Sequence, residues 1–121
     1  MAKVDTTDWG TWKRIGAATV LSSWNPTTTP ETNTVNVAAY VPAGTKAIGG
    51  WFNVSSSAVG DTVGIRETGG SANVAFLRTQ VANQAITMWF EVQLDSSYTF
   101  DVVASHLNIS DVDVIVTKVA L

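Results

Sequence analysis

Ile86-Thr87-Met88-Trp89-Phe90-Glu91-Val92-Gln93-Leu94 is the stretch in which apolar and polar residues alternate most regularly. Successive side chains of a β-strand point to opposite faces of the sheet, so residues two apart share a face. One face carries Ile86, Met88, Phe90, Val92 and Leu94, and the other carries Thr87, Trp89, Glu91, Gln93 and Asp95. The pattern predicts a half-buried strand with its apolar face against a core.

The same two-residue period recurs along the chain. It is clear at 98–104 and 112–116, it predicts further strands at 34–41, 47–54, 62–66 and 73–77, and a weaker strand covers 15–24. Turn-forming residues separate these runs, and Asp95-Ser96-Ser97 is short enough for a tight hairpin turn. Residues 26–34 are rich in threonine and hold two prolines, so we expect an exposed loop there.

These runs predict an all-β fold with little or no helix. About eight strands suffice for two packed four-stranded sheets, so we predict an antiparallel β-sandwich that is jelly-roll-like. An immunoglobulin-like sandwich is the nearest alternative, but the chain lacks the cysteines of its usual disulfide. We expect one domain over residues 15–121, preceded at 1–14 by an N-terminal arm or first edge segment.

The composition narrows the classes of function. Charged residues make up 14% of the chain, against roughly 25% in an average soluble domain, which favours association because interface cores are depleted of charge. The seven Lys and Arg residues are scattered and the net charge is −3, so no basic stripe for nucleic acid is visible. No run of about 18 apolar residues predicts a membrane span.

No constellation of residues predicts catalysis. His106 is the single histidine, and the adjacent Ser105 points to the opposite face of a strand. Asp111 and Asp113 share a strand face and are candidates for a calcium ion or for acid–base work, but neither role has visible supporting groups. We therefore predict no enzyme, no cofactor and no metal site, with the aspartates serving to discourage stray strand pairing.

The chain is rich in tryptophan, and these residues are its strongest candidates for a binding surface. They are Trp9, Trp12, Trp24, Trp51 and Trp89. Trp89 lies opposite the apolar face of its strand, and Trp51 lies on a weakly apolar face with Asn53, so both are candidates for a subunit contact, a glycan platform or packing beneath a loop. Trp9 and Trp12 belong to the segment that we interpret as an arm on the domain or on a neighbouring subunit, with a simple first strand as the alternative. Gly49-Gly50, beside Trp51, predicts a bulge or a close approach of another backbone.

A family resemblance covers roughly residues 35–121. The stretches Tyr40-Val41-Pro42-Ala43-Gly44-Thr45-Lys46-Ala47-Ile48, Gly60-Asp61-Thr62-Val63-Gly64-Ile65-Arg66 and Asp111-Val112-Asp113-Val114-Ile115-Val116 together resemble small β-sandwich domains of bacteriophage virion proteins. The resemblance lies in spacing and residue type, and it carries no catalytic residues.

The resemblance implies a structural or attachment role on a virus particle, often as a trimer. We therefore expect a virion protein, assembled in the host cytoplasm, that binds itself and other virion proteins on a capsid or tail surface. The start at a methionine and the apolar end at Val119-Ala120-Leu121 suit a small stand-alone protein such as a capsid decoration protein. The alternative is a carbohydrate- or receptor-binding module, with a surface glycan on Trp51 or Trp89.

Overall fold

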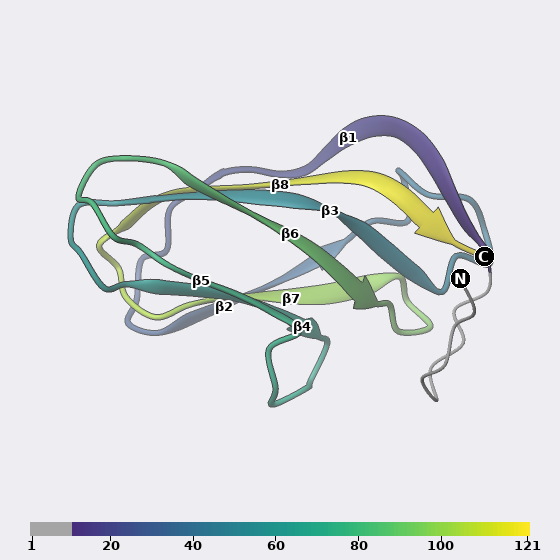
Figure 1. Cartoon of the computed structure of the whole chain (residues 1–121). Coiled ribbons are helices and arrows are strands. Elements are labelled where there is room, and N and C mark those ends of the chain that lie inside the picture. Colours follow the sequence, from purple (N-terminus) through teal and green to yellow (C-terminus); the bar gives the residue numbers. More distant parts are fainter. Residues whose placement is uncertain (1–10) are drawn as a thin grey trace.

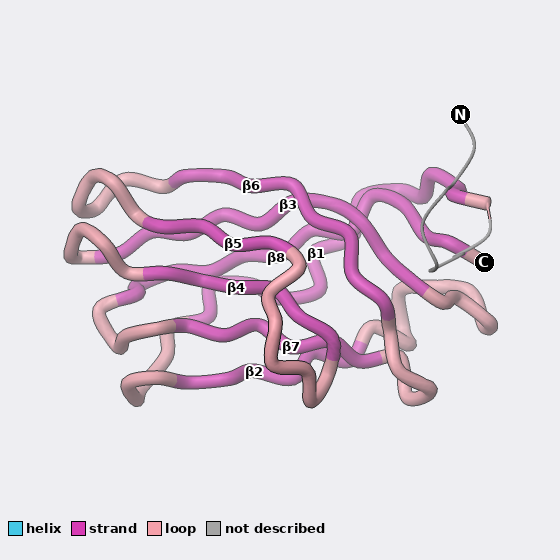
Figure 2. The backbone as a smooth tube through the Cα atoms, turned by 60° about the horizontal axis from the view of Figure 1, so that its bottom comes forward, coloured by secondary structure: helices cyan, strands magenta, loops and turns pink. Residues whose placement is uncertain are grey.

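Eight antiparallel strands form two sheets in the computed structural model, which describes residues 11–121 (Figure 1). The strands are β1 (Trp12–Trp24), β2 (Glu31–Asn36), β3 (Ala47–Ser56), β4 (Thr62–Glu67), β5 (Ala75–Arg78), β6 (Ile86–Gln93), β7 (Thr99–Ala104) and β8 (Ile109–Ala120). This part of the chain contains no helix (Figure 2), and so none long and apolar enough to cross a membrane.

The strand order confirms the predicted β-sandwich. One sheet has the order β1-β8-β3-β6 and the other β2-β7-β4-β5. The first strand pairs with the eighth, the second with the seventh, the third with the sixth and the fourth with the fifth. A long hairpin of eight strands that folds over on itself gives this pairing, and it is the arrangement of a jelly roll.

The core lies between the two sheets and follows the predicted alternation. Phe52 and Phe90 meet edge to face at 6.1 Å between ring centroids, and Phe90 stacks on Phe100 of the other sheet at the same distance. Around this aromatic centre, the inward residues of β3, β4, β7 and β8 are almost fully buried. The predicted turn at Asp95 is present, with Tyr98 N–H donating to the Asp95 carbonyl at 3.0 Å, but it joins β6 to β7 of the other sheet and so does not form the expected hairpin.

The strand predicted at 34–41 is wrong in its second half. Strand β2 ends at Asn36, whose side-chain oxygen accepts the Ala38 N–H at 2.9 Å, and Tyr40 N–H donates to the Val37 carbonyl at 2.8 Å. An asparagine that caps its own backbone in this way offers an alternative to the strand ladder. Residues 38–40 therefore form a turn.

The loop predicted at 26–34 is shorter than expected, because β2 already begins at Glu31. The Glu31 carboxylate accepts the N–H groups of Thr27 and Thr28 at 2.9 and 3.1 Å, which closes the loop within a few residues. At the other end, β1 begins at Trp12, and Trp12, Lys13 and Arg14 pair with β8. Residues 1–10 of the predicted arm lie outside the described residues.

Candidate binding face

The outer face of the β1-β8-β3-β6 sheet carries Trp51 and Trp89, with Trp12 beside it, whereas Trp24 packs against the core. Trp51 of β3 pairs directly with Trp89 of β6, and on its other side with Ile115 of β8, which in turn pairs with Thr19 of β1. Trp89 is 68% exposed, whereas Trp51 is half-buried. The prediction that Trp89 points away from the core is therefore confirmed.

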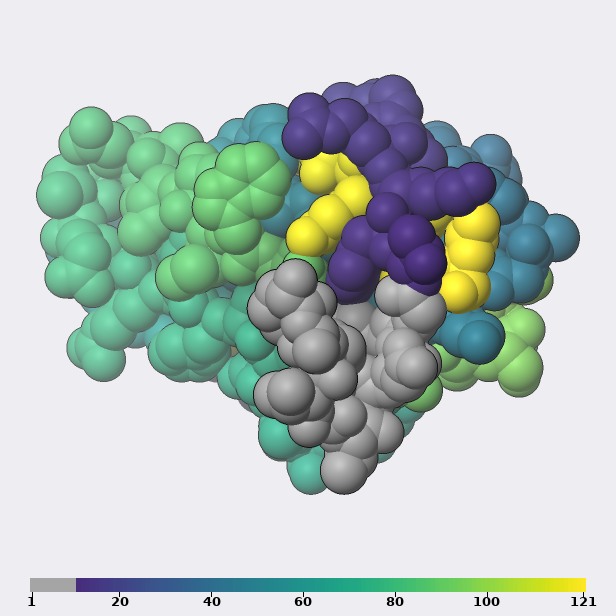
Figure 3. Space-filling model, turned by 45° about the vertical axis from the view of Figure 1, so that its right-hand side comes forward, coloured from purple at the N-terminus to yellow at the C-terminus, as the bar shows by residue number. Residues whose placement is uncertain are grey.

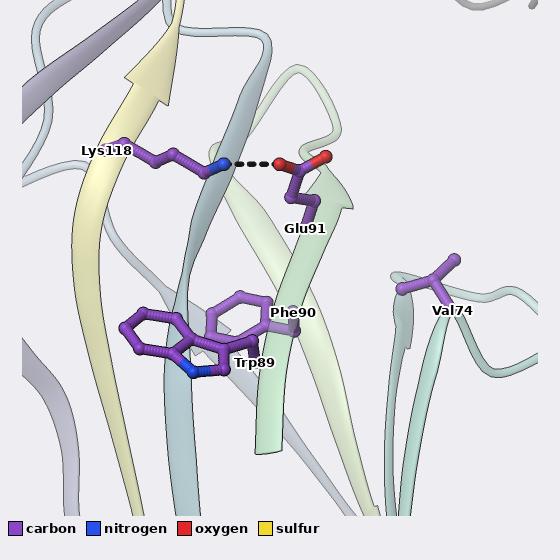
Figure 4. Close-up of a pocket in the computed structure, with 5 residues that line it drawn as sticks. All are labelled: Val74, Trp89, Phe90, Glu91 and Lys118. Atoms are coloured by element: carbon purple, nitrogen blue, oxygen red, sulfur yellow. Dashed lines mark hydrogen bonds and ion pairs between the residues drawn. The ribbon is translucent and has the colours of Figure 1, made fainter.

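Lys118 links three strands across this face. Its ammonium group forms an ion pair with Glu91 of β6 (Figure 4) and lies 4.5 Å from the ring centroid of Trp12. The Lys118 side chain crosses β3 at Gly49, where an added Cβ would lie 2.5 Å from the lysine Cε. Gly49 therefore keeps this crossing open.

Two irregularities shape the face. Thr117 of β8 has no register partner on β3, between the pairs Gly49–Lys118 and Gly50–Val116, so the predicted bulge at Gly49-Gly50 is confirmed. On the other side of β8, three residues of β1, Ile15 to Ala17, lie opposite Thr117 alone. Extra residues in one strand bend it away from its partner, and the first half of β1 arches away from β8 (Figure 1).

The arch of β1 leaves two adjoining hollows on the face, with atoms of β8 visible at the bottom of a depression between β1 and β6 (Figure 3). One hollow, of about 500 Å³, is lined by Arg14, Ile15, Ala17, Trp89, Thr117 and Lys118. The other, of about 430 Å³, is lined by Ala17, Thr19, Ser22, Trp51, Asn53, Asp113 and Ile115. Because Ala17 borders both, we call them together the β1 groove.

The two aspartates lie at the end of the groove away from Lys118. Asp113 accepts the Ser23 N–H at 2.7 Å and lines the hollow beside Trp51. Burial, followed by the neighbouring charge of Asp113 and a hydrogen bond to it, raises the pKa of Asp111. Within residues 11–121, no set of three His, Cys, Asp or Glu side chains is arranged to hold a metal ion.

His106 and Ser105 are engaged in local backbone hydrogen bonds. The His106 Nδ1 accepts the Asn108 N–H at 3.0 Å, and the Ser105 Oγ accepts the Thr62 N–H at 2.8 Å. These contacts hold the loop between β7 and β8 and leave the two residues without a mutual hydrogen bond within 11–121. The geometry gives no nucleophile–base pair at this position.

A second exposed feature lies at the edge of the sandwich where β5 and β6 run beside each other (Figure 2). Both are edge strands of their sheets. Four large apolar side chains are exposed here: Val74 at 52%, Phe76 at 50%, Met88 at 39% and Trp89 at 68%. We call this set the β5–β6 edge. Val74 and Trp89 both line a hollow of about 490 Å³, and the Trp89 indole is directed away from Val74, toward β3 and β8 (Figure 4).

The sequence pattern found part of this site. Of its four candidate residues, Trp51, Trp89 and Trp12 lie on or beside the outer face, and Trp9 lies outside the described residues. It missed Lys118 and Thr19, which come from strands distant in sequence. The alternation at 73–77 predicted that Phe76 and Leu77 lie on opposite faces of a strand. It did not indicate which of the two is buried.

No protein-family model and no curated protein matches the chain.

Proposed function

We propose that this chain is a non-enzymatic virion structural protein that self-associates, as a trimer, and attaches to a capsid or tail surface. The observation that carries the self-association is the β5–β6 edge, where four large apolar side chains are exposed on or beside two strands that each have one free edge. Monomeric proteins protect such edges with charge or cover. The resemblance in residue spacing to bacteriophage virion domains supports the virion setting.

The free energy gained by burying the apolar side chains of this edge can be compared with the cost of association. A tryptophan side chain offers roughly 150–250 Å², and Trp89 is 68% exposed, so its burial is worth about 3 kcal/mol gross at 25 cal/mol per Å². Association itself costs at least about 4 kcal/mol. Trp89 alone therefore does not hold copies together, whereas burial of Val74, Phe76 and Met88 with it exceeds this lower bound.

Closed rings of three copies use a head-to-tail contact, so the β5–β6 edge of one copy meets a different surface of the next. The low fraction of charged residues helps here, because few charges lose their water on contact. Lys118 and Glu91, which line the hollow with Val74 and Trp89, form an ion pair, so their charges offset each other.

Sedimentation velocity over a micromolar concentration series tests the self-association. The wild-type chain should sediment as an oligomer, and Trp89→Ala and Phe76→Ala should each weaken association at least about tenfold, the effect of a residue that dominates an interface. Leu107→Ala is the matched control, because Leu107 is 49% exposed but lies in the loop beside Thr29. A wild-type chain that stays monomeric throughout would contradict the self-association.

Attachment to a virion is tested separately. Mass spectrometry of particles purified from the source culture should find the chain together with capsid and tail proteins, at a copy number that is a multiple of three. Its consistent absence from purified particles would contradict the virion role, whatever its oligomeric state.

A further inference from the structure

We infer that the β1 groove is a binding site for a neutral oligosaccharide, with Trp51 as the stacking platform and Asn53 and Asp113 as the hydrogen-bonding groups. This inference goes beyond the proposed function, since it requires neither self-association nor a virion. It rests on the hollow of about 430 Å³ between β1 and β3, a volume within the usual range for small-ligand sites.

The lining of this hollow combines an aromatic ring with free polar groups. Asn53 uses its side-chain oxygen to accept a hydrogen bond from Thr87, and Asp113 uses one carboxylate oxygen to accept the Ser23 N–H. Asn53 Nδ2 and the hydroxyls of Thr19 and Ser22 form no hydrogen bond within residues 11–121, whereas the Asp113 carboxylate also interacts with Asp111. The Asn53 amide is thus held by one bond and keeps its N–H donors for a ligand, which lowers the entropy lost on binding.

This combination fits a sugar ring. A pyranose has an apolar C–H face that packs on an indole and hydroxyl groups that both donate and accept at its rim. Trp51 and Ile115 supply the apolar contact, Asp113 accepts, and Asn53 Nδ2 donates. A sugar with an apolar face and a hydroxyl rim can cover the Trp51 indole and at the same time form hydrogen bonds with the polar groups.

The charge of the hollow selects against other ligand classes. No Lys or Arg lines it, and Asp113 has Asp111 beside it, so phosphate, sulfate and carboxylate groups are disfavoured. A peptide strand that paired with the sheet would need a free edge, whereas the hollow is floored by Ile115 in the middle of the sheet. Anionic groups and strand-forming peptides are therefore disfavoured in this hollow, and the pairing of an indole with amide and hydroxyl groups favours a neutral sugar. Arg14 and Lys118 line only the second hollow.

The second hollow provides room for a second sugar unit, so we expect an oligosaccharide rather than a monosaccharide. It adjoins the first at Ala17 and has Trp89 as its wall, and Trp89 is the direct cross-strand neighbour of Trp51. Side chains that pair directly lie about 5 Å apart at Cβ. Two indoles at adjoining positions offer platforms to two successive sugar units.

A glycan array probes this directly, using neutral hexose and N-acetylhexosamine oligosaccharides with sialylated and sulfated versions as comparators. Neutral glycans should bind and charged versions should bind more weakly. Calorimetric titration of the strongest neutral array ligand should then show at least about a tenfold loss for Trp51→Ala and for Asn53→Ala. Asn53→Ala keeps the test valid if Trp51→Ala does not fold, since Asn53 lies outside the core.

Phe76→Ala separates this inference from the proposed function. It lies on the β5–β6 edge and lines neither hollow of the groove, so it should weaken self-association and leave glycan affinity unchanged. The inference is overturned if the folded wild-type chain binds no neutral glycan at millimolar concentration, if it binds charged glycans alone, or if both groove variants bind as tightly as wild type.

Discussion

Replacing Gly50 with alanine tests the register of β3 against β8, on which the outer face depends. A Cβ added to Gly50 would lie 1.9 Å from the carbonyl oxygen of Ile115, 2.9 Å from its carbonyl carbon and 3.0 Å from Val116 Cα. All three atoms belong to the backbone of β8. No side-chain rotation relieves this contact, so the two strands must move apart.

The size of the effect follows from that distance. Real Cβ atoms do not approach other heavy atoms closer than 3.0 Å, so β3 and β8 must separate locally by about 1 Å. Overpacking of this kind costs about 1–3 kcal/mol, and two weakened ladder hydrogen bonds add about 1 kcal/mol each. We expect Gly50→Ala to lower the free energy of unfolding by about 3–5 kcal/mol, which is a large share of the 5–15 kcal/mol typical of a domain.

Guanidinium denaturation followed by tryptophan fluorescence measures the change at a protein concentration low enough to limit self-association. Gly16→Ala is the matched control, because an added Cβ on Gly16 of β1 meets nothing within 4 Å, and its effect should stay within about 1 kcal/mol. If Gly50→Ala unfolds within about 1 kcal/mol of wild type with an unchanged denaturant slope, the bulge and the register of β3 on β8 are wrong.

Two further predictions concern acidic residues with opposite effects of pH. Burial and Asp113 raise the pKa of Asp111, so the folded state loses stability as pH rises above about 4 and this carboxyl must ionise. Asp111→Asn should therefore raise the melting temperature by a few degrees at pH 7 and lose this advantage near pH 3; an equal gain at both pH values would refute the reasoning. Hydrogen bonds from Thr27 and Thr28 lower the pKa of Glu31, so its contribution is present at neutral pH and is lost as pH falls through the folded pKa. Glu31→Gln should lower the melting temperature at pH 7 and have no effect at strongly acid pH, as thermal melts across a pH series will show.

The strands predicted best from the sequence are those in which alternation directly reports one buried face. Residues 90–94 and 98–104 are of this kind, because their outward positions are mostly polar, whereas Met88 on the predicted inner face is 39% exposed where β6 lies at the sheet edge. Alternation does not identify the buried face where both faces of a strand carry apolar residues. In β5, Leu77 is buried and Phe76 is exposed, and a short edge strand gives the pattern too few residues to distinguish them.

Other features depended on contacts that no local pattern contains. The end of β2 is set by one side-chain hydrogen bond of Asn36. The crossing of Lys118 over Gly49 joins residues from three strands, so the glycine pair indicated the bulge but not what passes over it. Likewise, Trp51 and Asn53 were placed on one face, whereas Asp113 and Thr19 joined them only through the pairing of β8 and β1.

The place of β8 in its sheet has a consequence for biosynthesis. β8, the eighth strand in sequence order, lies between β1 and β3 and is hydrogen-bonded to both. Until residues 109–120 have been synthesised, β1 has no partner in its sheet. Its backbone N–H and C=O groups therefore stay unpaired during that time. Pairing between such distant segments is slow and exposes nascent chains to one another. We expect the β1-β8-β3-β6 sheet to form only after residues 109–120 have been synthesised, and the yield to depend on chaperones that hold the earlier strands until then.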